Sequence, residues 1–88
     1  WIMITKEIIK DRINYISQFC QTKIEVANIE SITDYFIVTI YGGNNGYGRL
    51  TNYLSDLKLI VDQFDDTWLI DWTNDCVDDV WYFKFAVR

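Results

Sequence analysis

The sequence contains no histidine and no proline, and only two of its 88 residues are cysteines. Without histidine the commonest general base of enzymes is missing, and neither a Ser-His nor a Cys-His pair can form. Two carboxylates can perform acid-base chemistry in glycosidases, but so small a domain has little room for a sugar cleft. One cysteine pair does not define a disulfide framework, so we expect Cys20 and Cys76 to be reduced thiols. We therefore expect a protein that is not an enzyme.

Long apolar runs and clusters of positive charge are also lacking. No apolar run approaches the roughly 18 residues that a membrane span requires. The N-terminus does not show the basic segment and apolar stretch of a signal peptide. Lysine and arginine total only eight, whereas surfaces that bind phosphates or anionic lipids cluster these residues. We expect a cytoplasmic protein that binds neither nucleic acid directly nor a membrane.

The most distinctive stretch present is residues 62–79, with the sequence DQFDDTWLIDWTNDCVDD. Its formal charge is −7, because it has no lysine or arginine; the whole chain carries −5, so the remainder carries +2. Two tryptophans lie inside the stretch and further aromatic residues follow it. Its aspartates are Asp62, Asp65, Asp66, Asp71, Asp75, Asp78 and Asp79. Such charge favours a basic partner, either a protein groove or a surface that normally holds nucleic acid.

The acidic stretch has three interpretations. A carboxylate at the C-terminal end of a helix interacts unfavourably with the helix dipole and costs about 0.3–1 kcal/mol of stability. Residues that contradict local structural preferences in this way tend to mark functional sites. The first interpretation is therefore a partner-binding surface of these seven aspartates, with Trp72 and Tyr82 as aromatic members. The second is an ordinary solvated loop of an acidic protein. The third is a calcium or magnesium site with oxygen ligands from Asp71, Asp75, Asp78 and Asp79, although the stretch lacks the glycine and glutamate of an EF-hand.

No cofactor motif is present, and we expect no cofactor. The glycine-rich segment 42–48 precedes a predicted helix, where an anion can bind in other proteins. It lacks the Lys-Ser/Thr pair of a Walker loop and the G-x-G-x-x-G pattern. Its residues tolerate positive φ, so we predict that it serves as a flexible connection between a strand and a helix.

Two helices are predicted, over residues 5–20 and 47–63, because apolar residues recur there at helical spacing. Thr5 is a suitable N-cap for the first. The predicted apolar stripe of the first helix consists of Ile8, Ile9, Ile13, Ile16, Phe19 and Cys20. That of the second consists of Leu50, Tyr53, Leu54, Leu57, Ile60, Val61 and Phe64. We expect Ile13, Ile16, Leu54 and Leu57 to be nearly inaccessible.

Four strands are predicted, over residues 23–30, 34–41, 67–73 and 80–87, because β-branched and aromatic residues alternate there. Residues 23–30 place apolar side chains on both faces, which either a bulge or burial of both faces explains. Trp68 and Trp72 lie four residues apart and are expected to share one face of their strand.

The predicted element order is helix-strand-strand-helix-strand-strand, and the length predicts a single α+β domain over residues 1–88. An offset of 44 residues aligns the two helical stripes, which suggests a pseudo-repeat of 5–41 and 48–87; common helix periodicity explains the match equally well. A four-stranded antiparallel sheet with both helices on one face buries the stripes. The other face is then open to water or a partner. Its candidate aromatic residues are Tyr35, Tyr41, Tyr82 and one or two tryptophans.

In size, charge and aromatic content the chain resembles small acidic inhibitors that phages and mobile elements use against host nucleic-acid machinery, including anti-CRISPR and DNA-mimic proteins. This resemblance implies a non-enzymatic inhibitor or adaptor that occupies a basic, nucleic-acid-binding surface of a partner protein, in the host cytoplasm if a phage encodes it. The alternative is a structural module in which aromatic residues of the open sheet face bury against a second copy, giving a homodimer. Salt separates the two hypotheses, because electrostatic steering weakens as the Debye length shrinks while an apolar dimer persists.

Overall fold

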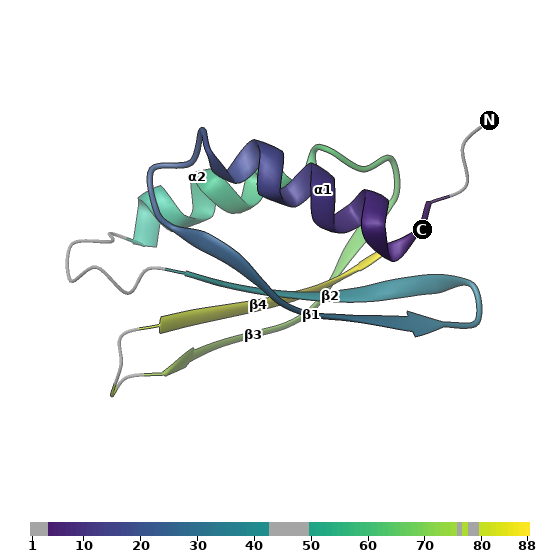
Figure 1. Cartoon of the computed structure of the whole chain (residues 1–88). Coiled ribbons are helices and arrows are strands. Elements are labelled where there is room, and N and C mark those ends of the chain that lie inside the picture. The colour runs from purple at the N-terminus through teal and green to yellow at the C-terminus, as the bar shows by residue number, and fades with distance from the viewer. Residues whose placement is uncertain (1–3, 43–49, 76, 78–79) are drawn as a thin grey trace.

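Two helices lie on one face of a four-stranded antiparallel sheet, as the sequence predicts (Figure 1). The computed structural model describes residues 4–42, 50–75, 77 and 80–88, with only the backbone for residues 50–52. The elements are α1 (Lys6–Ser17), β1 (Ile24–Ile32), β2 (Tyr35–Gly42), α2 (Leu50–Val61), β3 (Thr67–Asp75) and β4 (Val80–Val87). The α+β class and the predicted element order are therefore confirmed.

Helix α1 begins where the sequence predicts and ends earlier. The Thr5 side chain accepts a hydrogen bond from the Ile8 N–H at 3.2 Å, as an N-cap does. The predicted helix extends to residue 20, but α1 ends at Ser17, and the next three residues bond to carbonyls only three residues back. This tighter turn leaves Phe19 exposed, contrary to its predicted place in the stripe, while Cys20 packs partly buried against the core.

Helix α2 buries a narrower face than predicted. Tyr53, Leu57 and Ile60 are buried at i, i+4 and i+7. Leu54 is 42% exposed, so the expectation that it is inaccessible is wrong. It follows Tyr53 directly and is therefore rotated by about 100° away from the buried face. Asp56 is buried instead, which the sequence pattern did not indicate. Predicted helical residues 47–49 lie outside the described residues.

The strand order is β1-β2-β4-β3, so the second and last strands form the centre of the sheet. The β1–β2 register shifts between Val26 and Asn28, which confirms a bulge as the explanation for the mixed faces of residues 23–30. A second shift lies in β3 between Leu69 and Asp71 and was not predicted. Because the bulge adds one residue to β3, it reverses the alternation of the side chains that follow it.

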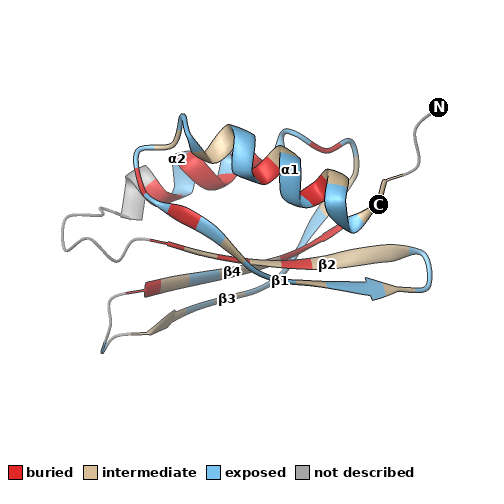
Figure 2. Cartoon of the chain, viewed as in Figure 1, coloured by how far each residue is buried: buried red, intermediate tan, exposed pale blue. Residues whose placement is uncertain are grey.

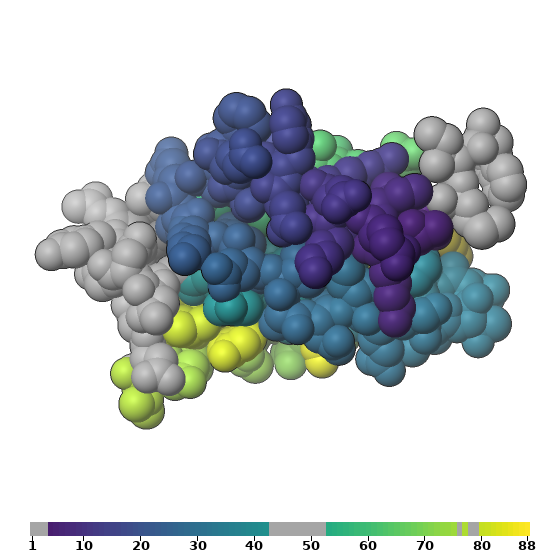
Figure 3. All heavy atoms as spheres, viewed as in Figure 1, coloured from purple at the N-terminus to yellow at the C-terminus, as the bar shows by residue number. Residues whose placement is uncertain are grey.

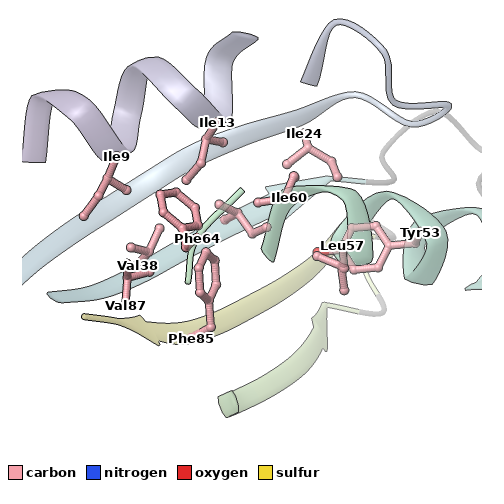
Figure 4. Packing of buried hydrophobic residues seen from close by; sticks show 11 residues of the cluster. Ile9, Ile13, Ile24, Val38, Tyr53, Leu57, Ile60, Phe64, Phe85 and Val87 are labelled. Atoms are coloured by element: carbon pink, nitrogen blue, oxygen red, sulfur yellow. The ribbon is translucent and has the colours of Figure 1, made fainter. Parts of the chain in front are cut away.

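The core lies between the helices and the sheet (Figures 2 and 4). Ile9 and Ile13 of α1 are fully buried, as are Val38 and Val87 of the central strands. Each such side chain contributes about 1.5–3 kcal/mol through its removal from water. Phe64 follows α2 and packs 6.3 Å from the ring of Phe85. Ile13 and Leu57 are nearly inaccessible as expected, while Ile16 is half-buried.

Gly42 is required by close packing rather than by a turn. It is the last residue of β2 and pairs with Ile24, although the sequence placed it in the flexible segment. A Cβ atom there would lie 2.5 Å from the Lys23 carbonyl oxygen and 3.0 Å from the Ile24 side chain. Only glycine lets the two strands approach this closely. Residues 43–48 of that segment lie outside the described part of the chain.

Candidate functional site

The acidic stretch is continuous in sequence but divided in space. The structure describes Asp62, Asp65, Asp66, Asp71 and Asp75, whereas Asp78 and Asp79 lie outside the described residues. Residues 62–66 connect α2 to β3 at the end of the molecule that also holds the C-terminus (Figure 1). Asp75 ends β3 at the opposite end, and β3 spans roughly 30 Å at about 3.3 Å per residue. The described aspartates therefore do not form one patch.

Asp66 has a counter-charge that is distant in the sequence. Its Oδ2 accepts hydrogen bonds from Nη2 and Nε of Arg88, at 2.8 and 2.9 Å. The Arg88 N–H also donates to the Asp66 carbonyl at 3.0 Å, which fastens the C-terminus to the start of β3. Both side chains are well exposed, so the ion pair contributes at most about 1 kcal/mol. Asp66 thus has a structural role as the partner of Arg88, which its position among other aspartates in the sequence did not indicate.

Two further aspartates have backbone partners. Oδ1 of Asp71 accepts from the Trp72 N–H at 2.8 Å. Oδ1 of Asp75 accepts from the Val77 N–H at 3.0 Å, as in an Asx-turn. The first bond lies next to the bulge of β3, and the second joins the end of β3 to Val77. Asp62 and Asp65 lie exposed in the connection that follows α2.

The sheet face opposite the helices presents two aromatic pairs. The alternation of the paired strands places Tyr35, Tyr41, Trp68 and Tyr82 on this open face. The rings of Tyr35 and Trp68 lie 5.3 Å apart, and those of Tyr41 and Tyr82 lie 6.0 Å apart. Trp68 and Tyr82 are each 38% exposed. The expectation of three tyrosines and a tryptophan on the open face is confirmed.

Trp72 lies on the opposite side of β3 from Trp68, so the expectation that they share a face is wrong. It pairs with Phe83, whose side chain packs against the core. Its ring meets that of Trp81 edge-on at 5.5 Å. The bulge in β3 causes this change, because one extra residue between the two tryptophans reverses the alternation. Trp72 is therefore a half-buried residue at the border of the core, on the helix-facing side of the sheet.

The open face is acidic because of residues from the two outer strands, β1 and β3. Its described strand positions carry four carboxylates, from Glu25, Glu30, Asp71 and Asp75. Lys84 is the one cationic side chain among the same described positions. Lys23 and Arg88 lie at the rim, each paired with a carboxylate. By contrast, the charged side chains of α1 are Lys6, Glu7, Lys10, Asp11 and Arg12. That helix carries a net charge of +1, whereas the four carboxylates and one lysine of the described open-face positions sum to −3.

Glu25 and Glu30 were missed by the sequence analysis. The bulge after Val26 brings both glutamates to the open face, and only the paired register reveals this. The Tyr41 hydroxyl donates to the carboxylate of Glu25, and Lys23 lies 3.5 Å from it. Both contacts hold the pKa of Glu25 below its usual value. Glu25 therefore remains charged under mildly acidic conditions.

Asp56 forms a buried polar site that the sequence did not indicate. Its two carboxylate oxygens accept the N–H groups of Gln21 and Thr22, at 2.9 and 2.8 Å, and the Thr22 hydroxyl. Partial burial and the nearby Asp56 charge raise the pKa of the Cys20 thiol to about 11. Cys20 is therefore a protonated, poorly nucleophilic thiol at neutral pH. Cys76 lies outside the described residues.

A groove of about 820 Å³ opens at the end of the molecule where α1 begins. Its charged lining residues are Arg12, Asp34, Asp65 and Arg88. The Arg12 guanidinium lies 5.9 Å from the centre of the Phe64 ring, and Arg88 is paired with Asp66. Because the charges balance and both cations already have protein partners, the groove has no marked preference for an anion.

The metal-site hypothesis gains no support from the described residues. Among them, no three acidic or cysteine side chains come together closely enough to hold a metal ion. Asp78 and Asp79, which complete the predicted ligand set, lie outside that part of the chain. Within the same residues, no helix is long and apolar enough to cross a membrane.

Comparison with known proteins found no matching family model, no matching curated protein and no matching solved structure.

Proposed function

We propose that this chain is a non-enzymatic protein-binding domain whose open sheet face recognises a basic surface of a partner protein. One observation carries the proposal: the face without helices presents two aromatic pairs among carboxylates from both outer strands. Antiparallel sheets commonly leave one face free, but such a face is usually polar. Four aromatic side chains on it are typical of an interface.

The two kinds of side chain have different roles in the proposed complex. Exposed aromatic residues such as Trp68 and Tyr82 supply rigid apolar area, which carries the lasting affinity of interfaces. The surrounding carboxylates steer a basic partner and set the rate of encounter. Surfaces of this basic kind normally bind nucleic acid, so the domain would act as an inhibitor or adaptor by occlusion. This is how anti-CRISPR and DNA-mimic inhibitors, which the chain resembles in composition, exert their effect.

Self-assembly is the second candidate function, and exposed apolar residues favour it. Trp68, Leu69 and Ile70 form a consecutive exposed apolar run on β3, which is an edge strand. Sedimentation at low and high salt tests this candidate. A dimer that persists at about 1 M salt, where the Debye length is about 3 Å, would support it. A monomer at both salt concentrations favours the proposed heteromeric function.

Affinity capture with matched baits tests the main proposal. The baits are the wild-type domain, the open-face variant Tyr82→Ala, and the helix-face variant Lys10→Ala as the control. We expect the wild type and the control to retain the same basic, nucleic-acid-binding protein and Tyr82→Ala to lose it. Equal retention by all three baits would show that the open face is not the recognition surface.

A further inference from the structure

The two edges of the sheet differ in their protection against pairing. At one edge, β1 exposes mainly polar side chains, including Glu25, Asn28 and Glu30, and such charges discourage the addition of a strand. At the other edge, β3 exposes Leu69 and Ile70, with exposed fractions of 58% and 43%. An exposed apolar edge strand is a template for another strand.

The bulge divides β3 into halves of different chemistry. Residues 67–70 form an apolar half, in which Trp68 points to the open face and Leu69 to the helix-facing side. Residues 71–75 form an acidic half, in which Asp71 and Asp75 both point to the open face. A strand added at this edge would meet apolar side chains beside the first half and carboxylates beside the second.

We propose that the β3 edge accepts an extended segment of the partner protein as a fifth strand, with an apolar half beside residues 67–70 and a basic half beside residues 71–75. The inference depends on the proposed function, because it names the element of the basic partner that docks at the border of the open face. Backbone hydrogen bonds from the edge provide affinity, while side-chain pairs across the new strand pair provide specificity. The space-filling view shows the β1 side of the molecule, and β3 lies at the far edge of the same sheet (Figure 3).

Charge argues against a second copy of this chain as the occupant. Aspartates flank the apolar run on both sides, at residues 62–66 and at Asp71 and Asp75. Antiparallel self-pairing along the whole length of β3 would place Asp71, its middle residue, opposite Asp71 of the other copy. Parallel self-pairing would place each aspartate beside its own equivalent. Like charges directly opposite each other destabilise a strand pair, whereas a basic segment relieves the same repulsion.

A peptide of defined chemistry tests the proposal. The probe is a nine-residue peptide, the length of β3, with valine in one half and alternating lysine and threonine in the other. The control is the same peptide with N-methyl groups on alternate backbone nitrogens, which removes the donors of one strand edge without changing the charge. We expect the unmodified peptide to slow hydrogen exchange of the β3 amides and to bind at least about tenfold more tightly than the control.

Protein variants separate this proposal from the proposed function. Leu69 and Ile70 are exposed, so the double variant Leu69→Lys/Ile70→Lys should fold; we expect it to weaken peptide binding about tenfold or more. Tyr82→Ala should leave peptide binding unchanged, although it impairs capture of the whole partner. Equal binding of the methylated and unmodified peptides, or no binding by either, would overturn the edge proposal and leave the open-face proposal to its own test. A dimer that the double variant dissolves would overturn it in favour of a second copy.

Discussion

The carboxylate of Asp56 accepts a hydrogen bond from the backbone N–H of Thr22, 34 residues earlier in the chain, at 2.8 Å. Both residues are almost completely buried, with exposed fractions of 1% and 3%. The same carboxylate also binds the neighbouring Gln21 N–H and the Thr22 hydroxyl. One side chain of α2 therefore satisfies the polar groups of the connection between α1 and β1, and it holds the first helix against the second.

Replacement of Asp56 by alanine should strongly destabilise the fold. Loss of the carboxylate leaves the buried N–H and hydroxyl of Thr22 and the partly buried N–H of Gln21 without their acceptor. An unsatisfied buried group costs about 1–3 kcal/mol, so we expect a loss of about 3 kcal/mol or more. The measurement is the free energy of unfolding in urea. Exposed Asp62 provides the matched control, and Asp62→Ala should change stability by no more than about 0.5 kcal/mol. Equal effects of the two substitutions would contradict this account of Asp56.

The Cys20 thiol should make stability fall at alkaline pH. Its pKa is raised from 9.0 to about 11 in the folded chain, mainly by burial and then by Asp56. The unfolded thiol therefore ionises first, so its contribution is complete below pH 9 and is lost as the pH rises towards 11. Urea unfolding at several pH values in a Cys76→Ser background measures this loss, with Cys20→Ser as the control that lacks it. Rapid alkylation of Cys20 at neutral pH would argue against the raised pKa.

Substitution of Gly42 by alanine should destabilise the β1–β2 pair. The added Cβ would lie 2.5 Å from the Lys23 carbonyl oxygen, a backbone atom that cannot rotate away. We expect a loss of about 1–3 kcal/mol, as for other overpacked sites. Thermal or urea unfolding measures it, with the exposed strand substitution Ser31→Ala as the control. If Gly42→Ala leaves the free energy of unfolding unchanged, β1 and β2 can move apart at this position with little loss of stability.

The charges and the aromatic residues of the open face should affect binding in different ways. With a basic partner, Glu30→Gln/Asp71→Asn should mainly slow association and reduce its salt dependence. Trp68→Ala should instead speed dissociation, at a cost of about 2 kcal/mol or more if Trp68 is a hot spot. Binding kinetics measured at several salt concentrations distinguish the two effects.

Trp72→Ala provides the matched tryptophan control. Because Trp72 packs on Trp81 behind the open face, its loss should lower the free energy of unfolding by about 1–3 kcal/mol with little direct effect on dissociation. A larger effect on dissociation from Trp72 than from Trp68 would place the recognition surface on the helix-facing side.

The class of fold, the order of the elements and most of the core are predictable from local sequence patterns. These features follow from local periodicity: Ile9 and Ile13 recur at helical spacing, and Val38 and Ile40 alternate along a strand. The end of α1 does not follow from this periodicity, because it depends on the tighter turn after Ser17. Local patterns also predict the open face and three of its tyrosines. Side chains alternate between the two faces of a strand, so the residues between the buried ones must lie on the open face.

The distribution of the acidic and aromatic residues over the surface depends on contacts between segments that are distant in the sequence. The extra residue Ile70 places Trp68 and Trp72 on opposite faces of β3. Such a bulge shifts the register of a strand without altering its composition, so the composition does not predict it. The partners Asp66 and Arg88 lie 22 residues apart, and Asp56 is buried because distant N–H groups need its oxygens. Pairing over such separations depends on how the strands and helices pack together. The described aspartates of residues 62–79 are therefore divided between the connection that precedes β3 and β3 itself.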